Sequence, residues 1–109
     1  MRMDYRRLFL IGLLCLMANE ASASDAALLA RGRHLVEANC AACHSIETQG
    51  ASSHPEAPPF RSLSDRYPVS DLQEALVEGI MTGHPDMPQF IATSEQASAI
   101  IAYIESLDR

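Results

Sequence analysis

Cys40-Ala41-Ala42-Cys43-His44 is the stretch that decides how the rest of this chain is organised. Two cysteines three positions apart, with a histidine directly after the second, form the C-x-x-C-H pattern of covalent haem attachment. Cysteines at this spacing lie about one helical turn apart, so both thiols can reach the two vinyl groups on one edge of a haem. The histidine then lies under the ring, where an imidazole nitrogen can bind the iron.

Two other uses of the cysteine pair compete with haem attachment. A thiol–disulfide oxidoreductase also carries C-x-x-C, and in an oxidising compartment Cys40 and Cys43 could form a disulfide. The oxidoreductase motif is typical of a chain that alternates strands and helices, and no such alternation surrounds this pair. The histidine directly after the pair, His44, favours haem over both alternatives.

The first 23 residues have the pattern of a secretory signal peptide. Three arginines near the start are followed by an apolar run of 11 residues at 8–18, and residues 21–23 (Ala-Ser-Ala) offer a small-x-small cleavage pattern. A membrane-spanning helix needs about 20 apolar residues, so this run is too short for a permanent anchor. We therefore expect a signal peptide at 1–23, a mature domain at 24–109, and a periplasmic location.

The export route has two candidates. Arg6-Arg7-Leu8-Phe9-Leu10 resembles a twin-arginine signal, which belongs to the pathway that exports folded proteins. Covalent haem is normally attached after an unfolded chain has been exported, so we favour the general secretory route. The residue pattern by itself leaves both routes open.

Removal of the leader would leave a domain of 86 residues with two cysteines, Cys40 and Cys43, because Cys15 lies inside the apolar run. The domain would contain five arginines, twelve acidic residues and no lysine, a net charge of about −7. Such a surface argues against nucleic acid or an anionic membrane as a partner. A chain this short buries a modest core, which a haem held by thioether bonds would enlarge.

The residues before the motif are predicted to form one helix. It is expected to begin near Ser24 or Asp25, both good N-cap residues, and to continue to about position 38. Gly32, Val36 and Cys40 are spaced by four and therefore share one helical face. A glycine in a helix interior costs about 1 kcal/mol relative to alanine. Close approach of another helix is the usual feature that offsets such a cost.

After the motif, residues 45–56 are polar, lack an apolar period and predict a surface loop. His54 in this loop is expected either to be exposed or to contact a haem propionate. Pro58-Pro59 then stiffens the chain, because each proline fixes its own φ and restricts the residue before it. Phe60 and Leu63 are expected to pack on the haem or beside it.

Capping boxes predict two further helices. Ser70 and Gln73 form the first box, before a helix that stops near Gly79, and Thr93 and Gln96 form the second. Each helix has a single apolar stripe. The stripes are Leu72, Ala75, Leu76 and Ile80 in the first helix, and Ala97, Ile100, Ile101, Tyr103, Ile104 and Leu107 in the second.

From about Asp25 to Leu107, the chain resembles the class I c-type cytochromes. Small members of that family carry a glycine, an apolar residue four positions later and the first haem cysteine four positions after that, as Gly32, Val36 and Cys40 do here. The haem motif, a Met-Pro loop and a closing amphipathic helix complete the resemblance. It implies an all-α small cytochrome c fold, with three main helices around one covalently attached haem c. It also implies that the first and last helices cross at a glycine–aromatic contact.

The resemblance also implies which residues hold the iron. Met87 stands where the family has its sixth ligand, and a soft, neutral thioether suits that position. In the family a proline carbonyl accepts a hydrogen bond from the far nitrogen of the ligating histidine and orients the ring. By position these residues are Pro58 and His44. Met81 and His84 are the competing candidates for the sixth ligand.

The expected function is one-electron transfer by a periplasmic carrier. If His44 and Met87 fill both axial positions, no vacant site remains for a substrate, so the chain is not expected to be an enzyme. Its partners would be redox proteins, and no membrane insertion is expected after leader cleavage. The alternative is a haem c subunit of a periplasmic dehydrogenase or oxidase complex. A thiol–disulfide oxidoreductase is the remote alternative.

Overall fold

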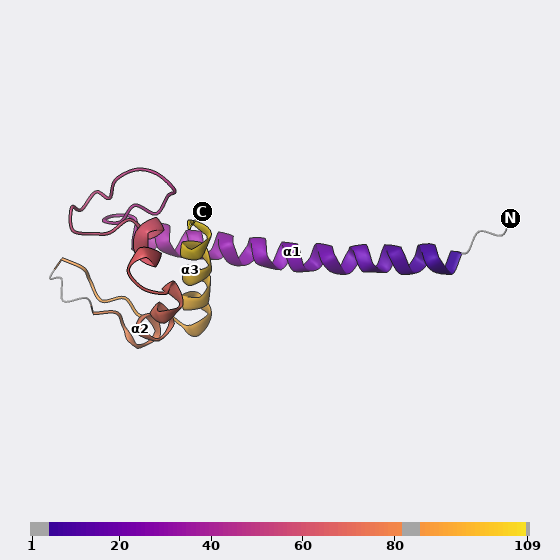
Figure 1. The fold of residues 1–109 in the computed structure, drawn as a ribbon. Helices are drawn as coiled ribbons and strands as arrows, with labels where there is room; N and C mark the ends of the chain where they lie inside the picture. Colours follow the sequence, from indigo (N-terminus) through magenta and orange to yellow (C-terminus); the bar gives the residue numbers. More distant parts are fainter. Residues whose placement is uncertain (1–4, 82–85, 109) are drawn as a thin grey trace.

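Five helices make up the described part of the structure, a computed structural model that covers residues 5–81 and 86–108, with side chains from residue 22 onward. In chain order they are α1 (Tyr5–Asn39), the 3-10 helices η1 (Phe60–Asp65) and η2 (Val69–Asp71), α2 (Leu72–Glu78) and α3 (Ser94–Ser106) (Figure 1). Within those two ranges the chain forms no β-strand, and one isolated antiparallel bridge joins Ile80 to Phe90. The predicted all-α fold with three main helices is confirmed.

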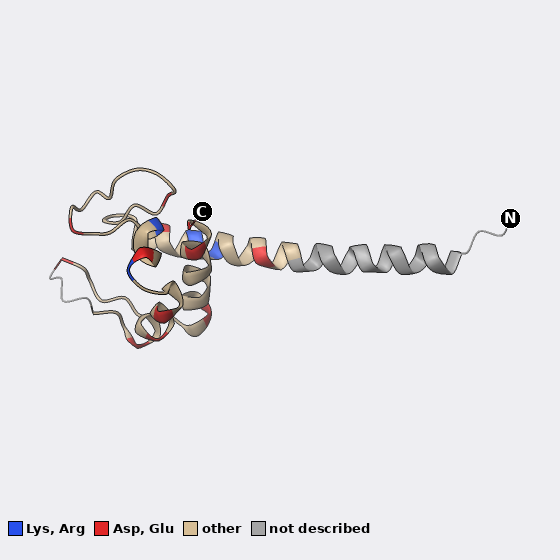
Figure 2. Ribbon diagram, viewed as in Figure 1, with Lys and Arg blue, Asp and Glu red and all other residues tan. Residues whose placement is uncertain are grey.

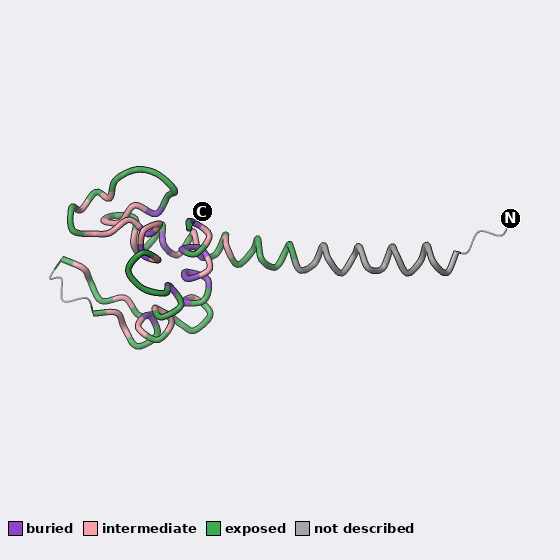
Figure 3. The backbone as a smooth tube through the Cα atoms, in the orientation of Figure 1, coloured by how far each residue is buried: buried purple, intermediate pink, exposed green. Residues whose placement is uncertain are grey.

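Helix α1 runs without a break through the expected cleavage site. The helix start predicted at Ser24 or Asp25 therefore lies inside α1, which begins at Tyr5 in the full chain. Residues 22–28 are exposed and lie on a part of α1 that projects from the other helices (Figure 3). The boundary after residue 23 stays a prediction. In the residues that the structure describes, no helix combines the length and the apolar character that a membrane span needs.

The crossing of α1 and α3 depends on Gly32. A Cβ atom at this position would lie 2.0 Å from the carbonyl oxygen of Ala99 and 2.8 Å from the Cβ of Tyr103. The two helices therefore approach each other more closely than any side chain on α1 at this point would allow. The expected crossing at a glycine–aromatic contact is confirmed, and the close approach explains the glycine in the helix interior.

A polar network ties this crossing to the segment after the haem motif. Tyr103, buried in α3, donates its hydroxyl proton to the carbonyl oxygen of Ile46 at 2.7 Å. Arg33 on α1 donates to the same hydroxyl at 3.1 Å and also binds the carboxylates of Glu37 and Glu47. Its hydrogen bond to Glu47 holds the pKa of that carboxyl below its ordinary value. Burial raises the pKa of Tyr103.

We expect Tyr103→Phe to lower the free energy of unfolding by about 1–2 kcal/mol, because the Ile46 carbonyl loses its donor while the ring still packs. Denaturant unfolding of the haem-loaded protein measures the change. The matched control is Tyr67→Phe, which removes a hydroxyl from an exposed tyrosine and should change stability by less than about 0.5 kcal/mol. Equal effects from the two variants would show that the Tyr103 hydroxyl adds nothing of its own.

Helix α3 begins at its predicted capping box. The Gln96 N–H donates to Thr93 Oγ1 at 3.1 Å, and the Thr93 N–H donates to Gln96 Oε1 at 2.9 Å. The predicted apolar stripe of this helix is buried along its whole length, at Ala97, Ile100, Ile101, Tyr103, Ile104 and Leu107. Together with Val36 of α1 it forms the centre of the core.

The capping box predicted for α2 is wrong. Ser70 lies in η2, and no side chain caps the start of α2. Gln73 instead donates from Nε2 to the carbonyl oxygen of Ser94 at 3.2 Å, which ties α2 to the first turn of α3. Gly79 ends α2 as predicted, with a φ of +100° that favours glycine. Ile80, which the apolar stripe had included in the helix, follows that end.

Candidate functional site

The haem motif continues the winding of α1 past the end of the helix at Asn39. The Cys40 N–H donates to the carbonyl oxygen of Val36 at 2.9 Å, as in the helix itself. The Cys43 and His44 N–H groups then both donate to the carbonyl oxygen of Cys40, at 3.2 and 3.0 Å. Cys40 and Cys43 therefore lie about one turn apart, as attachment to both vinyl groups requires. Both thiols are free and half-buried.

Burial raises the pKa of the Cys40 thiol to about 11. A thiol–disulfide oxidoreductase instead depends on a thiol whose pKa is lowered, because the thiolate is the attacking species. Cys40 also packs against the apolar core. Its surroundings therefore suit a buried covalent attachment better than thiol exchange.

His44 is held in one orientation by two neighbours. Its Nδ1 lies 2.8 Å from the carbonyl oxygen of Pro58. A carbonyl oxygen only accepts hydrogen bonds, so Nδ1 carries the proton and Nε2 keeps a lone pair for a metal. The centroid of the Phe60 ring lies 4.8 Å from the centroid of the His44 ring, and the two ring planes make an angle of 38°. The structure thus contains the contact predicted between Pro58 and His44.

Backbone hydrogen bonds hold the segment that makes these contacts. The Phe60 N–H donates to the carbonyl oxygen of Ser45 at 2.9 Å, which brings the segment before Phe60 back against the motif. The backbone N–H and the hydroxyl of Ser62 both donate to the carbonyl oxygen of Pro59, at 3.0 and 2.8 Å. Because Pro58-Pro59 also restricts its own backbone torsions, the carbonyl that faces the histidine is rigidly placed.

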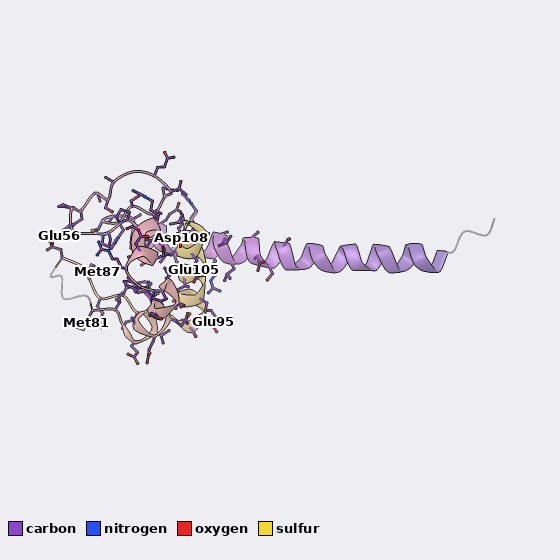
Figure 4. All side chains as sticks on the ribbon, in the orientation of Figure 1. Glu56, Met81, Met87, Glu95, Glu105 and Asp108 are labelled. Atoms are coloured by element: carbon purple, nitrogen blue, oxygen red, sulfur yellow. The ribbon has the colours of Figure 1, made fainter. Side chains whose placement is uncertain are left out.

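Met87 lies on a second loop, between α2 and α3. Its side chain is half-buried, whereas Met81 is 83% exposed. Figure 4 shows Met87 on the part of this loop that approaches the loop bearing Glu56, and Met81 on the part farther from it. The third candidate for the sixth ligand, His84, lies outside the described residues.

The two loops meet at His54 and Asp86. His54 Nε2 lies 3.0 Å from Asp86 Oδ2, and Asp86 directly precedes Met87 in the sequence. The expectation of an exposed loop histidine is wrong, since the side chain of His54 is only 28% exposed. Sequence patterns offer no signal for this pair, because its members stand 32 positions apart in two irregular loops.

The residues gathered around His44 fit a covalently attached haem. Two free thiols one turn apart match the two vinyl groups, and the His44 Nε2 offers a lone pair to the iron. Phe60 adds buried apolar surface next to the histidine, and Leu63 is buried in the same short helix, η1. The fit therefore rests on two thiols for attachment, one nitrogen donor for the iron and buried apolar side chains, all of which the chain itself supplies.

Comparison with known proteins identifies the family. The family model described as cytochrome c matches residues 29–108, which is most of the chain. A curated relative, a cytochrome c-553-like protein from Synechocystis sp., is 31% identical over 77 residues, which cover 71% of this chain and 67% of the relative. No solved structure matches the chain.

The fold and the site define a small helical haem protein with a covalent attachment motif. The chain belongs to the cytochrome c family, as a small class I c-type cytochrome. It therefore binds haem c, with its iron, and acts in electron transfer with redox partners. The predictions of family, fold class and cofactor are confirmed.

Proposed function

We propose that this chain is a periplasmic one-electron carrier whose haem is attached at Cys40 and Cys43 and has His44 and Met87 as axial ligands. The 2.8 Å contact between His44 Nδ1 and the Pro58 carbonyl oxygen carries the proposal. It leaves Nε2 without a proton and, together with Phe60, fixes where that atom points. A ring fixed in this way supports a permanent iron ligand better than a proton carrier.

Electron transfer is fast when the surroundings of the redox centre barely change. When bound, haem c supplies an iron that alternates between Fe(II) and Fe(III). The Pro58 carbonyl and the Phe60 ring hold His44 in the same place in both states. Methionine is a weaker donor to Fe(III) than a second imidazole, so Met87 favours Fe(II) and a relatively high reduction potential. The buried side chains of Phe60 and Leu63 would exclude water from the haem, which also favours Fe(II).

We infer that the protein catalyses no reaction of its own. With His44 and Met87 on the two faces of the haem, no coordination position is left for a substrate. This arrangement disfavours a peroxidase, an oxidase or an oxygen carrier. It also separates the proposal from the remote alternative, a thiol–disulfide oxidoreductase, which the pKa of about 11 at Cys40 opposes.

The proposed location is the periplasm. The leader pattern at residues 1–23 supports export, and covalent haem attachment normally follows export of the chain. N-terminal sequencing of the mature protein tests the boundary, with Ser24 as the expected first residue. Mature protein that still begins at Met1 would contradict the leader assignment.

The surface indicates which partners suit the protein. Acidic residues are spread over the loops and helices of the folded part, and the chain has no lysine (Figure 2). A redox partner would therefore dock through a basic surface or through an apolar contact around the haem edge. A permanent subunit of a dehydrogenase or oxidase complex is the alternative. Gel filtration separates the two, because a subunit would co-elute with its partner and a carrier would elute alone.

Two spectra of the exported protein test the proposal directly. The pyridine haemochrome spectrum is expected to be that of haem c with two thioether bonds. The oxidised protein is expected to show the near-infrared charge-transfer band of methionine-ligated haem. A colourless protein with free or disulfide-linked cysteines would contradict the haem site, and haem c without the near-infrared band would contradict the axial methionine alone.

Single cysteine variants should each lose one thioether bond. We expect Cys40→Ala or Cys43→Ala to shift the pyridine haemochrome spectrum to that of a singly attached haem. The yield of mature protein should fall several-fold, because the remaining bond holds the haem less securely. Haem staining of denatured protein on a gel measures covalent attachment. An unchanged spectrum and yield in both variants would rule out attachment by this pair.

A further inference from the structure

Two loops that are far apart in the sequence meet through one side-chain contact. The first loop, residues 45–57, follows the haem motif, and the second, which includes residues 86–92, carries Met87. Both lie at the same end of the folded part, away from the projecting end of α1 (Figure 1). His54 Nε2 of the first loop lies 3.0 Å from Asp86 Oδ2 of the second. The contact therefore joins the loop of the haem motif to the loop of the proposed sixth ligand.

Backbone hydrogen bonds hold His54 firmly in the first loop. Its N–H donates to the carbonyl oxygen of Cys43 at 3.1 Å, and its own carbonyl accepts from the N–H of Ala57 at 3.2 Å. The Glu56 N–H donates to the ring Nδ1 at 3.2 Å. An Nδ1 that accepts carries no proton, so Nε2 carries it and donates to Asp86. The bond to the carboxylate is therefore charge-assisted, which makes it stronger than a bond between neutral groups.

The two members of the contact differ in exposure. The side chain of His54 is 28% exposed, whereas that of Asp86 is 70% exposed. His54 is the fixed member, connected through one hydrogen bond to the haem-attachment residue Cys43. Asp86 is the member that docks onto it. Because adjacent Cα atoms are about 3.8 Å apart, a docked Asp86 leaves its neighbour Met87 little room to move.

We propose that His54 and Asp86 form a clasp that positions Met87 on the haem iron. His54 is the anchor, and the side chain of Asp86 is the point at which the second loop docks. Both are positioning residues, since neither donates to the iron. The proposal rests on the axial ligation proposed above for His44 and Met87. Its consequence is that the clasp keeps Met87 on the iron when an external ligand competes for the same position.

Imidazole is the probe for this competition, because it can bind Fe(III) only after Met87 has left. We expect His54→Ala and Asp86→Ala each to raise the imidazole affinity of the oxidised protein by about three- to tenfold, the effect of losing one partly exposed charge-assisted bond. The double variant should bind no more tightly than either single variant, because both remove the same bond. Spectrophotometric titration of the haem-loaded protein measures all three.

Two further variants separate positioning from general effects. His54→Gln keeps an N–H that can reach Asp86 and should bring the imidazole affinity back to within about twofold of the wild type. Glu105→Ala removes an equal charge from α3, apart from the loop positions of Glu56 and Met87 (Figure 4), and should leave the affinity unchanged. Unchanged affinity in both alanine variants, or additive effects in the double variant, would overturn the clasp.

Failure of the underlying ligation has its own signature. Met87→Ala should bind imidazole more tightly than either clasp variant, because no thioether is left to compete. If Met87→Ala binds imidazole like the wild type, the axial assignment is wrong, and the clasp falls with it. If Met87→Ala binds more tightly while the two clasp variants do not, the ligation stands and only the clasp is rejected.

Discussion

Met87→Ala is expected to abolish the near-infrared charge-transfer band of the oxidised protein and to lower the reduction potential by on the order of 0.1–0.2 V. The band reports the bond between iron and thioether sulfur, which the alanine variant cannot form. The shift is a fraction of the roughly 0.8 V over which axial ligands set haem potentials. It is negative because the thioether favours Fe(II), and water or hydroxide in its place favours Fe(III). Potentiometric titration followed by absorbance measures the shift.

Met81→Ala is the matched control for this experiment. Met81 lies on the same loop and is 83% exposed, so its removal should leave the band in place and shift the potential by less than about 0.02 V. The two methionines are chemically identical, which means that any difference between the variants comes from their positions. Loss of the band in Met81→Ala, with the band retained in Met87→Ala, would transfer the sixth-ligand role to Met81.

Gly32→Ala is expected to destabilise the haem-loaded protein by about 3 kcal/mol, at the upper end of the usual cost of overpacking. The added methyl group would lie 2.0 Å from the Ala99 carbonyl oxygen, and that atom belongs to the backbone of α3 and cannot rotate away. Helix propensity alone would favour alanine by about 1 kcal/mol. A net loss can therefore come only from the forced separation of α1 and α3. In a domain of this size the midpoint of thermal unfolding should fall by about 12–24 °C.

Ala30→Leu controls for adding bulk to α1. Ala30 is exposed, two positions before Gly32 on the same helix, and leucine is a good helix former. Its unfolding midpoint, followed by circular dichroism, should stay within about 2–4 °C of the wild type. A Gly32→Ala variant as stable as Ala30→Leu would show that the helix crossing tolerates a methyl group, and would contradict the contact distances.

Local patterns predicted the parts of the fold that depend on neighbours in the sequence. The Thr93–Gln96 capping box and the apolar stripe of α3 appear in the structure as predicted, because both arise within one or two helical turns. The same reasoning failed at Ser70 and Gln73, although the residue types were suitable. The Gln73 amide has a partner 21 positions away in Ser94, and a contact at that separation leaves no trace in a local window.

The candidate site likewise has parts that local sequence spacing predicts and parts that it does not. The spacing of Cys40, Cys43 and His44 is a property of one turn of chain, and the sequence by itself was enough to predict that one covalent haem is attached there. It also placed Pro58 by position, and the hydrogen bond to His44 is present.

Tertiary structure alone decided the contacts between distant segments. These are the bond from Tyr103 to Ile46 and the pairing of His54 with Asp86. Each joins residues that the sequence keeps far apart, and each exists because packing of α3 and closure of the loops bring them together. A short-range motif is encoded by the spacing of its members, whereas a long-range contact depends on the whole fold.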